Sequence, residues 1–343
     1  MQQLIKKIIN NAKRCPASIV FPEADEPRIL QAAAKCVKLG IAKPILLGNV
    51  KKTQNNFKKL KLSINKIKII DQYQSPKLRS YAKRMYQLRK KKGWRVEECR
   101  EKVKERIYFA TMMVEQRDVQ GLISGSSHSK GYSIRPALQL IKKQPGWVKK
   151  GKHDVSAVHI LLDKLHNNKP LFFSDVAITI NPTAEELAEI GIDAGIFAKK
   201  FNLKPRIAFL SFSTKGSAEH PLIDKVRKAV AIAQKINKKR RLGMIIDGEL
   251  QLDAAIDKRV NKIKCKNKKC SIKGDANVLI FPDLQAANIG YKLSQRLAGD
   301  LAIGPVVQGL SQPINDLSRG CTVDEIITLA AITSLEAAGR RFL

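Results

Sequence analysis

Long apolar runs are missing from this 343-residue sequence. None approaches the ~18 consecutive apolar residues that a membrane-spanning helix requires. The first segment, MQQLIKKIINNAKRCP, is basic and has no acid before Glu23, as in some transit peptides. Its apolar residues Leu4, Ile5, Ile8 and Ile9 instead fit an ordinary amphipathic helix of the folded domain. We therefore expect a soluble cytoplasmic protein without a membrane segment.

Acidic and aromatic residues are also scarce. Asp and Glu number 30 against 64 Lys and Arg, the formal net charge is +34, and aromatic residues make up 6%. Such a charge would ordinarily suggest nucleic-acid binding, but the basic residues are spread along the whole chain. No RNP-type, zinc-finger or helix-turn-helix signature accompanies them. We expect attraction of anionic substrates, with non-specific nucleic-acid binding at low salt as a by-product.

Cysteines are few, and several familiar motifs do not occur. The six cysteines are scattered and no secretory signal precedes them, so reduced thiols are expected rather than a disulfide framework. Cys265 and Cys270 form a single C-x4-C among lysines, which predicts unpaired loop cysteines rather than a zinc site. The sequence has no H-E-x-x-H, G-x-S-x-G, G-x-G-x-x-G or Walker motif. These absences argue against a catalytic metal, an acyl-serine hydrolase and the corresponding nucleotide-binding sites.

Short apolar segments alternate with helical segments along most of the chain. The expected strands include KPILLG, GLIS, VSAVHILLDK, LFFSDVAITI, RIAFLSFST, GMIIDGEL, ANVLIFPDL and AIGPVVQG. Such alternation predicts an α/β fold with largely parallel sheets, and the length suggests two domains. A capping-box pattern at Thr183 and Glu186 places one helix start after Asn181-Pro182.

One segment, Gly309 to Ile326, concentrates several chemically reactive groups. It reads GLSQPINDLSRGCTVDEI and carries a hydroxyl, a guanidinium, a thiol and two carboxylates: Ser318, Arg319, Cys321, Asp324 and Glu325. Thr322 with Glu325 forms a capping-box pattern, which predicts a helix start with free N–H groups and a positive dipole end. Arg319 adds a planar set of donors suited to phosphate or a developing oxyanion. The alternative is a plain capped helix with a solvated Arg319 and a Glu325 that only caps.

A second candidate is the loop from Ser124 to Ser129, which follows a predicted buried strand. Its small residues and hydroxyls could cradle phosphate through backbone N–H groups at the carboxyl end of that strand. His128 could act as a general base, although a structural hydrogen-bonding role is the more common one. Arg135, just before Pro136, lies near the start of the next expected helix.

These segments resemble the phosphate acetyltransferase family. The resemblance is carried in order by IVFPEADEPRIL, GLISGSSHSKGYSIRPALQLIKKQPG, RIAFLSFSTKGSAEHP, DGELQLDAAI, ANVLIFPDLQAANIGYKLSQRLAG and the Gly309–Ile326 segment. It implies two three-layer α/β/α domains around a cleft, related to the isocitrate and isopropylmalate dehydrogenases. The chain would return to the first domain at its C-terminus, giving residues 1–150 plus 303–343 and residues 151–302. A homodimer is expected on the same ground.

The resemblance also implies a mechanism. A carboxylate would take the thiol proton of coenzyme A, and the thiolate would attack acetyl phosphate directly in a ternary complex. Glu325 occupies the position of the family's aspartate and is one methylene longer, so the adjacent Asp324 is an alternative base. Ser318 would hydrogen-bond the thiol, and Arg319 would stabilise charge on the acyl oxygen. Cys321 matches a family cysteine near the site and is expected to be structural, because no histidine pairs with it.

Further residues receive binding roles from the resemblance. Phosphate contacts are expected from Arg89 and Arg135, other substrate contacts from Ser126, Ser127, His128 and Cys321, and coenzyme A contacts from Arg28 and Arg296. Coenzyme A would be a substrate, and no tightly bound cofactor or metal is expected. Two alternatives stay open: a phosphate butyryltransferase, and a nucleic-acid-binding protein on a decayed enzyme fold.

Overall fold

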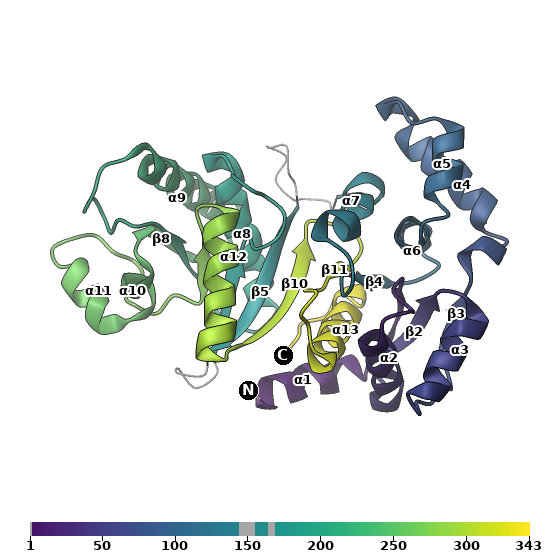
Figure 1. The fold of residues 1–343 in the computed structure, drawn as a ribbon. Helices are drawn as coiled ribbons and strands as arrows, with labels where there is room; N and C mark the ends of the chain where they lie inside the picture. The colour runs from purple at the N-terminus through teal and green to yellow at the C-terminus, as the bar shows by residue number, and fades with distance from the viewer. Residues whose placement is uncertain (1, 144–154, 164–168) are drawn as a thin grey trace. The chain divides into compact units, whose positions relative to one another are not determined.

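The computed structural model describes residues 2–143, 155–163 and 169–343 (Figure 1). The chain divides into two compact units, each with its own sheet. The terminal unit comprises Gln2–Pro145 and Leu310–Leu343, and the central unit comprises Gly146–Gly309. In the described part of the chain, no helix is long and apolar enough to cross a membrane.

The terminal unit contains a five-stranded sheet in the order β11-β4-β1-β2-β3, and all of its neighbouring strands pair in parallel. The strands are β1 (Ala17–Phe21), β2 (Ala42–Leu47), β3 (Lys68–Ile70), β4 (Gly121–Ser124) and β11 (Ile314–Asp316). The α-helices are α1 (Gln2–Ala12), α2 (Pro27–Leu39), α3 (Val50–Lys59), α4 (Leu78–Arg89), α5 (Val96–Lys102), α6 (Arg106–Glu115), α7 (Lys130–Leu140) and α13 (Val323–Ala337). Short 3-10 turns η1 (Gln72–Gln74) and η2 (Lys90–Lys92) flank α4.

Helix α13 is the central helix of this unit. It packs against α1, α2 and β1, so the C-terminal segment is tied to the N-terminal one (Figure 1). Its residues Ile326, Leu329, Ala330 and Ile332 are buried, as expected for a helix that covers a parallel sheet.

The central unit contains a six-stranded sheet in the order β10-β5-β6-β9-β7-β8. Its strands are β5 (Ser156–Asp163), β6 (Lys169–Ser174), β7 (Arg206–Leu210), β8 (Ile245–Leu250), β9 (Val278–Ile280) and β10 (Leu301–Gln308). Its helices are α8 (Ala184–Lys199), α9 (Pro221–Lys239), α10 (Leu252–Ile256), α11 (Lys258–Lys264) and α12 (Leu284–Leu293), followed by the π-helical turn η3 (Ser294–Ala298). Strand β5 runs antiparallel to both β10 and β6, whereas the other pairs are parallel.

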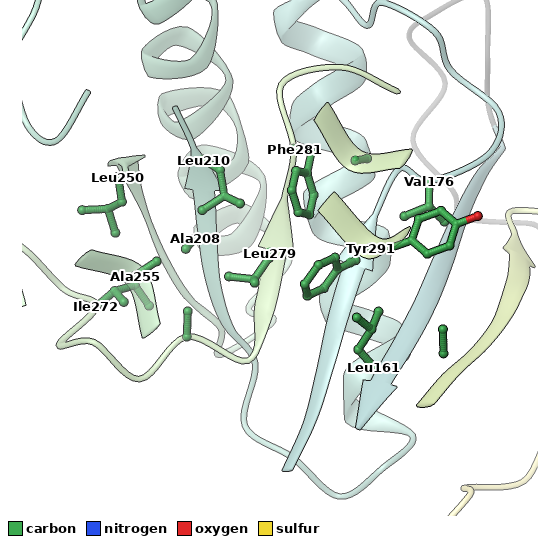
Figure 2. Close-up of a cluster of buried hydrophobic side chains, with 14 of the residues drawn as sticks. Leu161, Val176, Ala208, Leu210, Leu250, Ala255, Ile272, Leu279, Phe281 and Tyr291 are labelled. Carbon is green, nitrogen blue, oxygen red and sulfur yellow. The ribbon is translucent and has the colours of Figure 1, made fainter. Parts of the chain in front are cut away.

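An apolar cluster of buried side chains lies on one face of this sheet. Figure 2 shows side chains from β5, β7, β8, β9 and α12 meeting there, among them Leu161, Leu210, Leu250, Leu279 and Tyr291. Of these strands, β5, β7 and β9 lie in the interior of the sheet and are predominantly apolar, whereas β8 is an edge strand. The alternation of strands and helices in the sequence therefore predicted the fold class correctly: α/β with largely parallel sheets.

Two sequence-based expectations need correction here. The chain was expected to rejoin the first domain at residue 303, but β10 pairs with β5 along Leu301–Gln308, so the return to the first sheet comes with β11. Cys265 and Cys270 were expected to be unpaired, but they form a disulfide with a Cα–Cα distance of 6.3 Å. The physical reason is a hydrogen-bonded turn after α11, in which Lys268 N–H donates to the Cys265 carbonyl at 3.0 Å. This turn brings two buried thiols against the same apolar cluster.

Candidate active site

Three loops of the terminal unit begin at the same edge of its parallel sheet. Strand β4 lies between β1 and β11, and Asp316 is in register with Ser124. Just beyond the strands, Leu317 N–H donates to the Ser124 carbonyl at 2.7 Å. The carboxyl ends of parallel strands are where open α/β sheets place ligands. The loops after β1, β4 and β11 therefore define the candidate active site.

Glu23, in the loop after β1, organises the loop after β4. Its side chain is 4% exposed and accepts hydrogen bonds from both Ser126 and Ser127. The backbone N–H groups of these two serines lie 2.9 Å from the carboxylate, and the hydroxyls lie at 2.6 and 2.8 Å. His128 Nδ1 contacts the same carboxylate at 2.8 Å. The N–H groups expected to cradle phosphate thus hold a carboxylate of the chain itself, and the substrate role of residues 126–128 stays a prediction.

The pKa of Glu23 is set by two opposing effects. Burial raises it, but hydrogen bonds from Ser126, His128 and Ser127 lower it more, so the pKa falls below its ordinary value of 4.5. A lowered pKa means that this carboxylate contributes stability above pH 4.5, and that the contribution disappears as the pH falls through the folded-state pKa.

We therefore expect a pH-dependent effect of Glu23→Gln on the free energy of unfolding. At neutral pH the free energy of unfolding of the variant should be about 1–3 kcal/mol lower, because hydrogen bonds to a charged carboxylate are replaced by poorly matched bonds to a neutral amide. The difference from wild type should shrink as the pH is lowered below 4.5. Urea unfolding at several pH values measures this difference, and a pH-independent difference would contradict the assignment.

Gly125 allows β4 to turn into the loop. Its φ is +102°, a conformation that side chains other than glycine rarely adopt. A Cβ at this position would collide with the Asp316 carboxylate and would lie 2.9 Å from the Leu317 carbonyl oxygen. The close approach of β11 to this turn therefore requires glycine.

Replacing Gly125 by alanine should destabilise the protein by about 3 kcal/mol or more, because overpacking and left-handed strain add. Gly131→Ala is the matched control, since nothing lies within 4 Å of a Cβ there and the residue is helical. Thermal unfolding of both variants tests the expectation, and equal melting temperatures would refute it.

Arg28, at the start of α2, fastens the loop after β4 to the loop after β11. Its Nη2 donates to the Ser126 carbonyl at 3.0 Å, and its Nη1 donates to the carbonyls of Arg319 and Cys321 at 2.9 and 2.8 Å. Its Nε pairs with Glu26 at 2.9 Å. Most of the guanidinium donors are thus engaged within the chain, and the role of Arg28 in binding coenzyme A stays a prediction.

The loop after β11 presents Ser318 and Arg319. Ser318 is half-buried, its carbonyl accepts from Cys321 N–H at 2.9 Å, and its hydroxyl accepts from Gly320 N–H at 3.4 Å. Arg319 is exposed, while its carbonyl is held by Arg28. The backbone of this loop is therefore fixed while the guanidinium faces solvent, a geometry suited to an incoming anion.

The predicted capping box at the start of α13 is confirmed. Glu325 N–H donates to Thr322 Oγ1 at 3.2 Å, and Thr322 N–H donates to Glu325 Oε2 at 2.8 Å. The two candidate bases have different surroundings. Glu325 is 8% exposed, whereas the Asp324 side chain is 86% exposed and lies 3.5 Å from Lys35 Nζ. Of the two carboxylates, only Glu325 lies in a partly water-excluded setting at the helix N-terminus.

Cys321 lies beneath this loop and is 5% exposed. Burial is the main cause that raises the pKa of its thiol to about 12; the Arg28 guanidinium opposes this rise, and Glu325 adds to it. A thiol with this pKa stays protonated at neutral pH and is a poor nucleophile.

Cys321→Ala should consequently keep turnover of the same order as wild type, with a modest loss of stability from the small cavity. Steady-state kinetics decide the matter. Complete loss of activity in a folded variant would revive covalent catalysis through this thiol.

Arg89 and Arg135 belong to a second cluster of the same unit, built on aromatic rings. Arg89 is half-buried, lies 5.3 Å from the Trp94 ring centroid and donates to the Gln139 carbonyl at 3.3 Å. Tyr108 hydroxyl donates to Gln139 Oε1 at 2.9 Å. The exposed Arg135, in the second turn of α7, lines a cavity of about 350 Å³ with Lys102, Glu105, Tyr108, Ser129, Gly131, Tyr132 and Pro136. This cluster offers several cations to an anion, as the phosphate assignment requires.

A further cavity of about 240 Å³ adjoins Glu23. It is lined by Pro22, Glu23, Asp25, Arg106, Ile107, Ser124, His128, Tyr132 and Ser133. Among the described residues, no group of three or more His, Cys, Asp or Glu side chains could hold a metal ion.

The terminal unit thus brings together most residues expected from the sequence: Arg28, Ser126, Ser127, His128, Ser318, Arg319, Cys321 and Glu325. Arg296 lies exposed on η3 of the central unit, and its role in binding coenzyme A stays a prediction. Sequence reasoning missed Glu23. One signal could have indicated its role: Glu23 follows a buried strand, as the serine-rich loop does.

The fold and the site define an α/β protein with a cationic candidate site at the carboxyl edge of a parallel sheet. A model of the family described as phosphate acetyl/butaryl transferase matches residues 3–334. The chain belongs to this family.

Individual relatives agree with this assignment. Phosphate acetyltransferase of Thermoanaerobacterium thermosaccharolyticum is 44% identical over 335 residues, covering 97% of this chain and 99% of that protein. Phosphate acetyltransferase of Clostridium acetobutylicum is 44% identical over 338 residues, covering 97% and 98%. A phosphotransacetylase from Streptococcus pyogenes superposes with a TM-score of 0.85 at 38% identity, covering 98% of both chains. A 4-hydroxythreonine-4-phosphate dehydrogenase from Klebsiella pneumoniae (TM-score 0.52, 12% identity, covering 94% of this chain and 99% of that one) shares the fold, in line with the expected dehydrogenase-like architecture.

Proposed function

We propose that the protein is a phosphate acetyltransferase, which reversibly transfers an acetyl group between acetyl phosphate and coenzyme A. The chain is 44% identical to two phosphate acetyltransferases over 97% of its length, which supports the reaction class. The structural observation that best supports this chemistry is the arrangement of the loop after β11. There an exposed Arg319 on a fixed backbone precedes a helix N-terminus that carries a buried carboxylate.

The proposed chemistry assigns one task to each group of this loop. Glu325 accepts the proton of the coenzyme A thiol, and the resulting thiolate attacks the acetyl carbonyl in a ternary complex. Because a carboxylate is a weak base for a thiol, nearby positive charge and the α13 dipole help by lowering the thiol pKa. Arg319 stabilises charge on the acyl oxygen, and Ser318 hydrogen-bonds the thiol. Inorganic phosphate leaves with the bonding electrons.

Arg89 and Arg135 are proposed to hold the phosphate, supported by their place in the aromatic-backed cationic cluster. Arg28 and Arg296 are proposed contacts for coenzyme A, and Arg28 also holds the carbonyls of Ser126, Arg319 and Cys321. We further propose a cytoplasmic homodimer without a tightly bound cofactor, as the sequence led us to expect.

The test is thioester formation by the purified chain from coenzyme A and acetyl phosphate, with butyryl phosphate in parallel. We expect a higher kcat/KM with acetyl phosphate. A preference for butyryl phosphate would keep the mechanism and change the substrate. Turnover of neither substrate, together with salt-dependent DNA binding, would favour a nucleic-acid-binding protein on a decayed enzyme fold.

A further inference from the structure

Glu23 has no place in the acyl-transfer scheme above, yet it makes the densest set of hydrogen bonds at the site. One carboxylate oxygen accepts from the N–H and hydroxyl of Ser126, and the other accepts from the N–H and hydroxyl of Ser127. His128 Nδ1 approaches the second oxygen at 2.8 Å. Five donors converge on one carboxylate, which has about four lone-pair sites. Such saturation fixes the loop after β4 more firmly than turn geometry alone would.

The contact with His128 determines how the imidazole is presented. Nδ1 also lies 3.0 Å from Ser127 Oγ, but the Ser127 hydroxyl donates its hydrogen to Glu23. Because a carboxylate only accepts hydrogen bonds, we infer that Nδ1 carries the hydrogen that faces Glu23. Nε2 is then the ring nitrogen left to face away from Glu23. The ring stacks on Tyr132 with centroids 4.6 Å apart, and the side chain is 48% exposed. Orientation by a carboxylate behind the ring is the arrangement that fixes an imidazole in one tautomer.

The same hydrogen bonds reach the loop after β11. Ser126 donates to Glu23 through its N–H and hydroxyl, and its carbonyl accepts from Arg28 at 3.0 Å. Arg28 in turn holds the carbonyls of Arg319 and Cys321. A continuous chain of charge-assisted hydrogen bonds therefore runs from Glu23 to the backbone that carries Arg319.

We propose that Glu23 is a positioning residue for acyl transfer. Its carboxylate holds the loop after β4 so that His128 presents Nε2 toward the substrate, and through Arg28 it sets the backbone that carries Arg319. The inference rests on the proposed function for its catalytic consequence, and on the hydrogen bonds alone for the tautomer.

Glutamine and aspartate replacements separate the carboxylate's role from simple space filling. Glu23→Gln keeps the size of the side chain but turns an NH2 group toward donors. It should lower kcat about 10²-fold with little change in KM for acetyl phosphate, as expected for a misplaced transition-state contact. Glu23→Asp retains the charge and should recover about tenfold of that loss, which a requirement for shape alone would not produce.

Asp25→Asn is the matched control. Asp25 lies two residues away in the same loop, and its carboxylate pairs with Lys52 at 3.0 Å and with Arg106, not with residues 126–128. Its kcat should stay near that of wild type. A Glu23→Gln enzyme with wild-type kcat, an equal loss in Asp25→Asn, or a Glu23→Asp enzyme no better than Glu23→Gln would each overturn the proposal.

The tautomer provides a readout that needs no activity. Nitrogen-15 NMR of labelled histidines measures it, and the His128 signals are identified because they disappear in His128→Gln. We expect hydrogen on Nδ1 in wild type and in Glu23→Asp. In Glu23→Gln we expect a mixture of the two tautomers. Should Glu23→Gln fail to fold, wild type and Glu23→Asp still decide. A wild-type His128 with hydrogen only on Nε2 overturns the inference. A wild-type chain without acyl transfer but with the Nδ1 tautomer refutes the proposed function and leaves the orienting role of Glu23 intact.

Discussion

Arg319→Ala is expected to lower kcat for acetyl-CoA formation by about 10²–10³-fold while leaving the fold intact. The size follows from removing a preorganised donor from a developing oxyanion, the kind of interaction that contributes most in acyl transfer. The fold should survive because the Arg319 side chain is exposed and Arg28 binds the backbone carbonyl of residue 319, which the substitution keeps.

Arg340→Ala is the control for charge alone, since Arg340 is an exposed arginine of the same unit. Its kcat should match wild type. Thermal unfolding of both variants separates catalysis from stability. Near-normal turnover in Arg319→Ala would remove this residue from the mechanism.

Glu325→Gln is expected to reduce kcat by about 10²–10⁴-fold, the range for loss of a positioned general base. Glutamine can still act in the capping box with Thr322, so the free energy of unfolding should change little. This substitution therefore separates the two roles of Glu325, the helix cap and the base.

Asp324→Asn is its natural counterpart. Asp324 is almost fully exposed next to Lys35, and its variant should turn over like wild type. If Asp324→Asn loses activity and Glu325→Gln keeps it, the base is Asp324. The pH profile of kcat in each variant gives a second reading, since loss of the base removes the acidic limb.

Local patterns predicted the parts of this molecule that depend on local physics. The capping boxes at Thr183 and Thr322 follow from residue types three positions apart, and both occur. The alternation of apolar strands with helices predicted the largely parallel sheets. The antiparallel edge formed by β5 and β10 could not be predicted, because the apolar pattern of a buried strand is the same in either direction.

The interactions of Glu23 and Arg28 were beyond sequence reasoning for a different reason. Each acts on residues about 100 or more positions away, which become neighbours only because β4 lies between β1 and β11. In the sequence, Glu23 is only the first acid of the chain, and Arg28 is an expected contact for coenzyme A. The disulfide was missed because six scattered cysteines gave no indication that a turn after α11 joins two of them.

The central claim is that the acetyl group passes directly from acetyl phosphate to the thiol of coenzyme A, with no acyl-enzyme. Isotope exchange between labelled inorganic phosphate and acetyl phosphate tests it most directly. With coenzyme A present, label should enter acetyl phosphate as the reaction runs in both directions. Without coenzyme A, no label should enter, because no acyl acceptor exists. Exchange in the absence of coenzyme A would demonstrate an acyl-enzyme and contradict the mechanism, and no exchange in its presence would contradict the proposed reaction itself.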